Sequence, residues 1–246
     1  MVTAKLIAAH RGGRSSATPN TFQAFEHAIG IGADMIELDV RRTSDDELVV
    51  FHDEAIGSEP LRTLSCQELQ ERAGKLGYSI PRFAEVIELA SGRILLDIEL
   101  KESGYEDEVL QLVFDRRLNM SDFVITSFLE EVVAAVEAMS PEVRTGLLVD
   151  QGGEMTGLRA LEIFSKSGAD LLAPHYTLLD EWTLREAEAA GTTLLPWTVN
   201  GRDDIERLLA AQAVFGVITD EPELGLRLRA VSGSWPSRAG AHRSDR

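Results

Sequence analysis

Two short stretches of the sequence carry acidic side chains two residues apart. Glu37 and Asp39 alternate with apolar residues in the run Met-Ile-Glu-Leu-Asp-Val, and Asp97 and Glu99 do the same within residues 94–101. Because side chains alternate along a β-strand, each acidic pair faces one way while the apolar residues face a core. Carboxylates that meet in one cavity repel each other and gain protons unless a cation neutralises them.

These acids predict a site for one divalent cation. All-oxygen ligation favours hard ions such as Mg²⁺ or Ca²⁺ over zinc. Three protein carboxylates would leave coordination positions for water and for a substrate oxygen, as catalysis requires. The alternative is a set of salt bridges with the neighbouring basic residues Arg41, Arg42 and Lys101.

Three histidines end or follow apolar runs. His10 ends the run 6–10, His52 ends the run 48–52, and His175 comes directly after a third run. In a barrel of parallel strands these positions lie at the carboxyl-terminal rim, where catalytic groups gather. Histidine titrates near neutrality, so a pair can supply one base and one acid at the same pH. Taken alone, His10 or His52 is better explained as a hydrogen-bonded rim residue, and the pair is what favours catalysis. His175 is a candidate to line the pocket.

The charge of the chain limits its ligands. Its 41 acidic and 24 basic residues give a formal net charge of −17. Such an excess disfavours nucleic acid and stable association with anionic membranes. A ligand that carries phosphate must be attracted locally, and Arg11 and Lys101 are the basic side chains beside the candidate residues. Lys101 can equally pair with the neighbouring acids.

Short β-rich runs alternate with longer amphipathic stretches. This alternation predicts parallel strands in an α/β fold, and about eight such units in 246 residues favour a (β/α)₈ TIM barrel over an open sheet. The expected strands are residues 6–10, 35–40, 48–52, 94–100, 123–128, 145–149, 170–174, 193–199 and 214–219. The expected helices lie near residues 22–29, 83–90, 106–117, 130–139, 157–167, 181–190 and 203–211.

One domain of residues 1–231 is expected. The strands 35–40 and 48–52 are too close for a helix between them and predict a hairpin-like extension. Residues 54–81 interrupt the alternation with Gly, Pro and polar residues, which indicates a small excursion over the barrel mouth with one short helix near 66–72. Residues 232–246 have no apolar periodicity, so we expect a disordered tail.

The expected location is the cytoplasm. No apolar run approaches the ~20 residues of a membrane-spanning helix. The first nine residues are too short for a signal peptide and continue into the first expected strand. The single cysteine, Cys66, excludes an internal disulfide and suits a reducing compartment.

An ordered set of short motifs resembles the glycerophosphodiester phosphodiesterase family. These are His-Arg-Gly at residues 10–12, Asn-Thr-Phe-Gln-Ala-Phe at 20–25, Gly-Ala-Asp-Met-Ile-Glu-Leu-Asp-Val at 32–40 and Val-Val-Phe-His-Asp at 49–53. Downstream, Asp-Ile-Glu-Leu-Lys at 97–101, Thr-Ser-Phe at 126–128, Pro-Trp-Thr-Val-Asn at 196–200 and Ile-Thr-Asp-Glu-Pro at 218–222 are also similar. Each motif is weak alone, but the set spans nearly the whole body of the chain.

The resemblance implies a TIM barrel that hydrolyses glycerophosphodiesters to glycerol 3-phosphate and an alcohol such as choline or ethanolamine. It also implies roles for individual residues. The divalent cation, Mg²⁺ or Ca²⁺, is then expected on Glu37, Asp39 and Glu99, the catalytic pair is His10 and His52, and the phosphate contacts are Arg11 and Lys101. Trp197, in the motif at 196–200, joins His175 as a candidate for the pocket.

Two departures from the family pattern and two alternative functions remain. The smaller departure is Asp46-Glu47 in place of the family's Asp-Gly, which changes a turn. Where the family has Pro-Glu-Asn-Thr, this chain has Thr-Pro-Asn-Thr, so Pro19 replaces an acid that could pair with Arg11 or shape the start of a helix. The nearest alternative function is a lysophospholipase D or a cyclising phospholipase on a related barrel. A catalytically silent binding barrel is the other, but the expected histidines and acids are all present.

Overall fold

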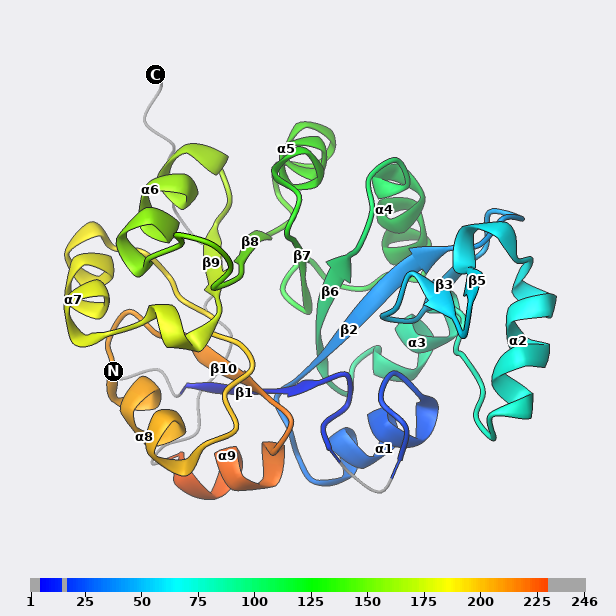
Figure 1. Cartoon of the computed structure of the whole chain (residues 1–246), viewed down its shortest axis with the longest axis horizontal. Coiled ribbons are helices and arrows are strands. Elements are labelled where there is room, and N and C mark those ends of the chain that lie inside the picture. Colours follow the sequence, from blue (N-terminus) through cyan, green and yellow to red (C-terminus); the bar gives the residue numbers. More distant parts are fainter. Residues whose placement is uncertain (1–4, 15–16, 230–246) are drawn as a thin grey trace.

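The computed structural model describes residues 5–14 and 17–229, and its parallel strands form a curled sheet (Figure 1). The expected tail, 232–246, lies outside the described residues. Neighbouring strands in the sheet follow the order β10 (Gly216–Thr219), β1 (Leu6–His10), β2 (Met35–Arg42), β6 (Leu95–Leu100), β7 (Phe123–Ser127), β8 (Thr145–Val149) and β9 (Leu171–Pro174).

The segment around Leu194 closes the sheet into a barrel. Leu194 forms parallel bridges to Leu172 of β9 on one side and to Val214, just before β10, on the other. The expected strand 193–199 is therefore present only as isolated bridges. Pro196 explains the difference, because proline has no N–H to donate to a sheet and interrupts regular pairing.

Helices surround the strands on the outside of the ring (Figure 1). Each barrel strand, the bridging segment included, leads to a helix before the next, which confirms the predicted α/β barrel. The helices are α1 (Phe22–Gly30), α3 (Phe83–Ala90), α4 (Glu106–Asp115), α5 (Glu130–Met139), α6 (Gly157–Ser167), α7 (Glu181–Ala190), α8 (Arg202–Ala210) and α9 (Pro222–Leu228). The last of these was not predicted, because it is short and begins with a proline.

The alternation along the strands separates two cores. Ile36 and Leu38 of β2 point outward and are buried in the cluster beneath the helices. Met35 points inward and packs with Ala8 and Leu195 in the cluster that fills the barrel interior. The inner face of β2 is thus apolar at its start and acidic further along, so the sequence pattern places the acids toward the carboxyl-terminal mouth.

The stretch after β2 forms the expected extension. The strand β3 (Leu48–Val50) pairs antiparallel with β2, and residues 54–81 add β4 (Ala55–Ile56), β5 (Glu59–Pro60), the 3-10 helix η1 (Leu61–Thr63) and α2 (Cys66–Lys75). A small apolar cluster that includes Val49 and Leu69 holds this excursion on β3. Ser65 begins α2 with a capping box that involves Glu68.

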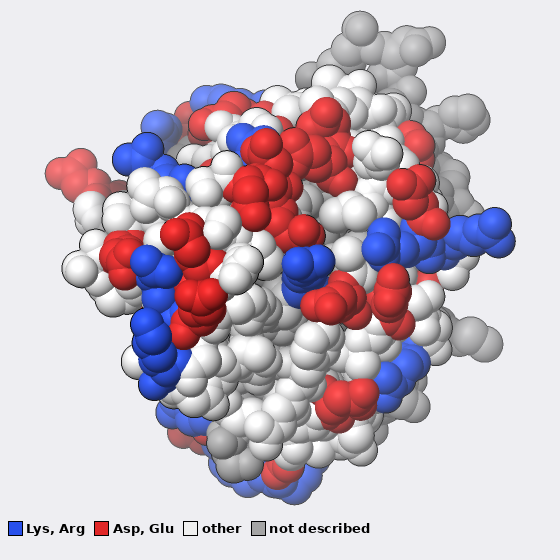
Figure 2. Space-filling view, turned by 90° about the vertical axis from the view of Figure 1, so that its right-hand side faces the viewer, with Lys and Arg blue, Asp and Glu red and all other residues white. Residues whose placement is uncertain are grey.

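The side of the molecule that carries α2 has acidic and basic side chains interspersed (Figure 2). This face therefore lacks the continuous basic surface that nucleic acid binding needs. None of the helices in the described part of the chain is long and apolar enough to pass through a membrane.

Candidate active site

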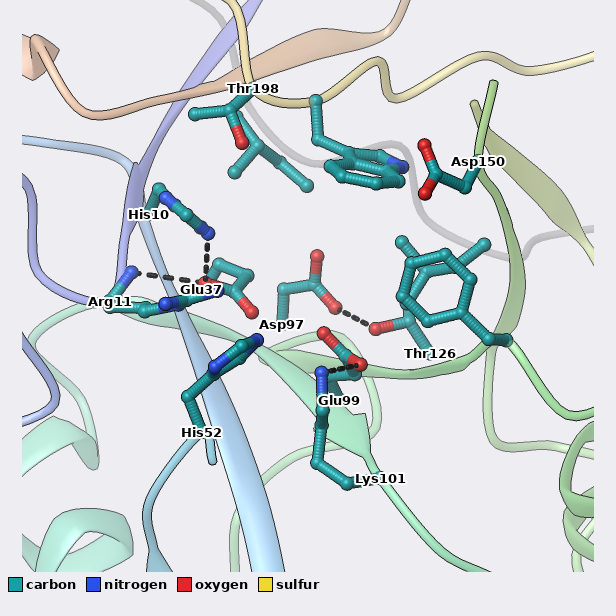
Figure 3. A pocket seen from close by; sticks show the side chains of 14 residues that line it. His10, Arg11, Glu37, His52, Asp97, Glu99, Lys101, Thr126, Asp150 and Thr198 are labelled. Atoms are coloured by element: carbon teal, nitrogen blue, oxygen red, sulfur yellow. Dashed lines mark hydrogen bonds and ion pairs between the residues drawn. The ribbon is translucent and has the colours of Figure 1, made fainter. Parts of the chain in front are cut away.

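A pocket of about 270 Å³ opens among the carboxyl-terminal ends of the strands (Figure 3). Most of the expected site residues line it. The lining residues include His10, Arg11, Glu37, His52, Glu99, Lys101 and Trp197. Asp39 lies beneath this surface with no exposure. His175 is not among the lining residues, but its ring centre lies 5.2 Å from that of Trp197, which is.

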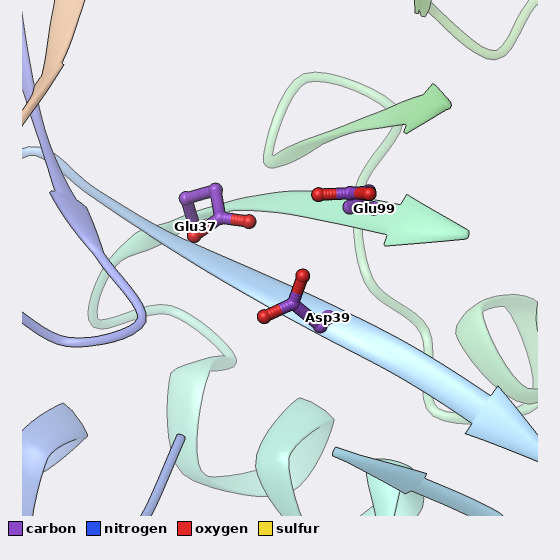
Figure 4. A group of neighbouring side chains, drawn as sticks. All are labelled: Glu37, Asp39 and Glu99. Atoms are coloured by element: carbon purple, nitrogen blue, oxygen red, sulfur yellow. The ribbon is translucent and has the colours of Figure 1, made fainter. Parts of the chain in front are cut away.

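Glu37, Asp39 and Glu99 come together between β2 and β6 (Figure 4). One oxygen atom from each carboxylate lies within 4.8 Å of one oxygen of each of the others. The register of the two strands causes this, since Asp39 is paired with Glu99 and Glu37 with Asp97. Alternation along each strand then puts all four acids on the inner face of the barrel.

Burial makes this cluster unfavourable for negative charge. It raises the pKa of Glu99 to about 7, with the charge of Asp39 adding to the effect. It also raises the pKa of Glu37 well above the usual range, again assisted by Asp39. Asp97, which accepts a hydrogen bond from the Thr126 hydroxyl at 2.7 Å, has a pKa raised to about 7 by burial.

Asp39 is the acid that is held ionised. Burial pushes its pKa up, but the positive charges of Arg11 and Lys101 outweigh that effect and leave the pKa below its usual value. Its Oδ2 atom lies 3.1 Å from the Arg11 Nε and accepts a hydrogen bond of 2.7 Å from the Asn20 amide. Its Oδ1 atom accepts no hydrogen bond, although the Lys101 Nζ lies 3.3 Å away.

The cluster fits a hard divalent cation. It offers only oxygen donors, and one buried Asp39 oxygen has no hydrogen bond. The alternative of salt bridges holds in part, because Lys101 pairs with Glu99 at 2.5 Å. The two neighbouring arginines instead point away, Arg41 to Glu102 and Arg42 to Glu108. Four buried acids therefore face the two positive side chains of Arg11 and Lys101.

His10 is held by residues from the other end of the chain. Its Nδ1 lies 2.7 Å from the Asp220 carboxylate, and its Nε2 lies 3.9 Å from Glu37. Asn200 donates a hydrogen bond of 2.7 Å to Asp220. Burial raises the pKa of Asp220, but the hydrogen bond and charge of His10 outweigh it and lower that pKa overall.

His52 lies across Glu37 from His10, and both rings point toward the acids (Figure 3). Its Nδ1 is 2.7 Å from the Asp53 carboxylate. Burial lowers the pKa of His52, although the negative charge of Asp39 opposes the shift. Its main-chain carbonyl accepts a hydrogen bond of 2.8 Å from the Arg41 Nε, which fixes the backbone beyond β3.

The turn after β1 explains the His-Arg-Gly motif. Arg11 has a φ of 53°, and its N–H donates to the carbonyl of Glu37 at 2.8 Å and to the Glu37 carboxylate at 3.0 Å. Gly12 has a φ of 90°, and a Cβ there would lie 2.6 Å from the Cβ of Ala24. Only glycine suits both conditions, so this residue allows Arg11 to turn toward Asp39.

The opposite side of the pocket is aromatic. Phe128 follows β7, and its ring centre lies 5.4 Å from that of Trp197, with the ring planes at 90°. The Trp197 Nε1 donates to the carbonyl of Ala173 at 2.8 Å, which fixes the indole. Asp150, directly after β8, completes this side (Figure 3).

Several of these residues were not assigned to the site from the sequence. Asp150 and Asp220 directly follow strands, the same signal that identified the histidines. Thr21 caps the start of α1, and the side chain of Asn20, the residue before it, donates a hydrogen bond to Asp39. Pro19, the departure from the family pattern, is exposed, and Arg11 pairs with Asp39 in its presence.

The chain is similar over most of its length to one known protein family and to several of its members. Residues 10–224 match the model of the glycerophosphoryl diester phosphodiesterase family. A glycerophosphodiester phosphodiesterase of Caldanaerobacter subterraneus subsp. tengcongensis is 31% identical over 245 residues, 91% of this chain and 97% of that protein. A crystal structure of a glycerophosphodiester phosphodiesterase from Thermotoga maritima has a TM-score of 0.76 and 28% identity, covering 92% of this chain and 98% of that one. A human lysophospholipase D is 41% identical over 78 residues, 30% of this chain and 25% of that protein.

Proposed function

Because the chain belongs to the glycerophosphoryl diester phosphodiesterase family, and is thus a phosphoric diester hydrolase, we propose that its pocket cleaves glycerophosphodiesters with His10 and His52 as the proton-transfer pair. The products are glycerol 3-phosphate and an alcohol. The observation that carries the proposal is the position of the two imidazoles on either side of Glu37 in one pocket.

The two histidines divide the proton transfers. One imidazole takes the proton from the attacking oxygen, and the other donates a proton to the leaving alcohol oxygen. Each ring has one nitrogen next to a carboxylate, Asp220 for His10 and Asp53 for His52, which fixes its orientation and leaves the other nitrogen for the substrate. The attacker is either water or the glycerol 2-hydroxyl, and the second route passes through a cyclic phosphate.

Arg11 and Lys101 would bind the phosphate. Arg11 reaches the pocket from the turn after β1, and Lys101 from the end of β6. Both are already held toward the acids, so they need little reorganisation when an anionic ester enters. Their charges stabilise the negative charge that grows on the phosphoryl oxygens during attack.

Glu37, Asp39 and Glu99 are the residues that would hold one divalent cation, Mg²⁺ or Ca²⁺. When bound, such an ion supplies positive charge to the phosphate and neutralises the buried acids. The chain's own contribution is the spacing of these carboxylates and their support, in which Asn20 and Arg11 hold one side of Asp39.

A single assay tests the function. Release of glycerol 3-phosphate from glycerophosphocholine is measured without additions, after EDTA treatment, and after Mg²⁺ or Ca²⁺ is restored. We expect activity that EDTA abolishes and one of the two ions recovers. Hydrolysis of lysophosphatidylcholine tests the lysophospholipase D alternative. Phosphorus NMR of the products tests the cyclising alternative, because it detects a cyclic phosphate. If the metal-loaded protein hydrolyses none of these esters, the proposed function is wrong and the catalytically silent binding barrel is the remaining alternative.

A further inference from the structure

We propose that Arg41 is a positioning residue that, together with Glu102, fixes the main chain of His52 in the active site. The inference rests on the proposed function, because it takes His52 as one of the two proton-transfer groups. Arg41 is not among the residues that line the pocket. Any effect that it has on catalysis must therefore pass through a residue that does.

Arg41 is buried at the mouth end of β2. Alternation along the strand puts its side chain on the same side as Glu37 and Asp39, and only 4% of the residue is exposed. A buried guanidinium is unfavourable unless its N–H groups find partners. Here the Nε donates a hydrogen bond of 2.8 Å to the main-chain carbonyl of His52, and the Nη1 pairs with the carboxylate of Glu102. The guanidinium thus joins two segments of the barrel mouth.

Glu102 gives the guanidinium a fixed anchor. Its main-chain N–H donates a hydrogen bond of 3.2 Å to the hydroxyl of Tyr105, which is buried, and that hydroxyl donates one of 2.7 Å to the carbonyl of Val40. The N–H of Lys101 also donates to the Val40 carbonyl, at 3.3 Å. The segment that carries Lys101 is therefore bound to β2, and the guanidinium extends this connection to the segment after β3.

His52 needs such support more than His10 does. The carboxylate that orients His10 belongs to Asp220, whose side chain is 21% exposed and is itself held by Asn200. The carboxylate beside His52 belongs to its neighbour Asp53, whose side chain is 70% exposed. An exposed ion pair contributes little, because water competes for both groups and the side chains lose freedom when they pair. The position of His52 therefore depends on how its main chain is held.

Neutralisation of the buried acids is the alternative role for this arginine. The geometry disfavours it, because the guanidinium is directed to Glu102, which is not one of the four acids on the inner face of the barrel. A lysine at position 41 would keep the positive charge. Its ammonium lacks the planar fork that reaches a carbonyl and a carboxylate at once. The two roles therefore predict different results for Arg41→Lys.

The experiment measures hydrolysis of glycerophosphocholine by the metal-loaded enzyme. We expect Arg41→Gln and Arg41→Lys to lower kcat by about 10- to 100-fold with little change in KM, because a small displacement of a catalytic group has an effect of this size. Glu102→Gln changes only the partly exposed partner and should cause a smaller loss of the same kind. Arg42→Gln is the matched control, because it removes the neighbouring arginine, which pairs with Glu108 instead, and should retain kcat. Full activity of Arg41→Lys would show that charge alone matters and would overturn the proposal.

Two measurements separate positioning from a general effect on the fold. In the His52→Ala background, Arg41→Gln should lower kcat by less than about twofold, because the group through which it acts is already absent. The imidazole carbon–proton NMR signals, assigned with His10→Ala and His52→Ala, should show that Arg41→Gln moves the signal of His52 but not that of His10. Losses that multiply in the double variant, or equal movement of both signals, would contradict a positioning role.

The NMR comparison needs no turnover, so it also separates this proposal from the proposed function. Near-normal hydrolysis by His52→Ala would end the catalytic role of His52, whereas a selective movement of its signal in Arg41→Gln would still support the connection. An impaired His52→Ala beside a fully active Arg41→Gln would overturn the positioning role alone.

Discussion

The carboxylate of Asp220 lies 2.7 Å from the Nδ1 of His10, although 210 positions separate the two residues in the sequence. The parallel pairing of β10 with β1 brings them together. Thr219 is in register with Ala9, and Asp220 and His10 are the residues that come next on the two strands. Asp220 is fixed in turn by Asn200. The closure of the barrel thus sets the orientation of one proposed catalytic imidazole.

Asp220→Asn should therefore impair catalysis more than binding. An amide in this position can present the wrong hydrogen-bonding group to Nδ1, so the ring loses its fixed tautomer and orientation. We expect kcat to fall by about 10- to 1000-fold with little change in KM. The measurement is steady-state hydrolysis of glycerophosphocholine beside a melting curve. A KM effect equal to the kcat effect would indicate that Asp220 binds substrate instead.

His10→Ala and His52→Ala should each lower kcat by about 10²–10⁴-fold, because each removes one proton-transfer group. A substrate with a p-nitrophenol leaving group, which needs no protonation, distinguishes their roles. One variant, lacking the general acid, should regain most of its rate on this ester, and the other should not. His27→Ala, at a half-buried histidine of α1 whose Nε2 lies 3.6 Å from Glu223 and which does not line the pocket, is the matched control. Equal rescue of both variants would contradict a division of acid and base.

Much of the fold follows from local pattern. The expected helices 83–90, 130–139, 157–167 and 181–190 have the same bounds as α3, α5, α6 and α7. These stretches have an apolar face that the strands bury. Two of them, α6 and α7, also begin at a side-chain cap and end at a glycine with positive φ, so local residues determine both of their ends. The segment 193–199 differs because one residue, Pro196, overrides the β-rich composition around it.

The site was predictable where it depends on alternation along one strand. Glu37, Asp39 and Glu99 face the same cavity because period-two spacing on two strands decides their direction. Asn20 was not predictable in this way. Its φ of 57° turns the side chain toward Asp39, and a single sequence does not distinguish that conformation from a helix cap. Asp220 was not predictable either, because it meets His10 only when the barrel closes and no local pattern links residues 210 positions apart.

Asn20→Ala should weaken cation binding. The Asn20 amide donates a hydrogen bond of 2.7 Å to the Oδ2 of Asp39, and both residues are buried. The substitution therefore removes a hydrogen-bond partner from a proposed metal ligand. Groups that hold metal ligands typically contribute about 10- to 100-fold in affinity. Titration of Mg²⁺ or Ca²⁺ against activity measures the effect, with the exposed Gln23→Ala on α1 as control. Unchanged half-saturation would show that Asn20 does not support the ligand.

Without a divalent cation the protein should become less stable as the pH rises from 5 to 8. Burial raises the pKa of Asp97 and of Glu99 to about 7, against ordinary values of 3.8 and 4.5. At pH values between the ordinary pKa and about 7, the folded state binds more protons than the unfolded state. The free energy of unfolding therefore falls as the pH increases. The loss is of the order of 3 kcal/mol for each group before the structure relaxes.

Chemical denaturation in EDTA at pH 5, 6, 7 and 8 measures this slope. Most ordinary carboxylates are ionised throughout this range, so their acid titration contributes little. Glu99→Gln removes one of the buried acids with a raised pKa and should make the slope shallower. Mg²⁺ or Ca²⁺ should flatten it further, because a bound cation favours the ionised acids that the metal-free cavity disfavours. A metal-free protein that is equally stable at pH 5 and pH 8 would contradict the raised pKa values of these buried acids. It would also remove one of the arguments for the cation site.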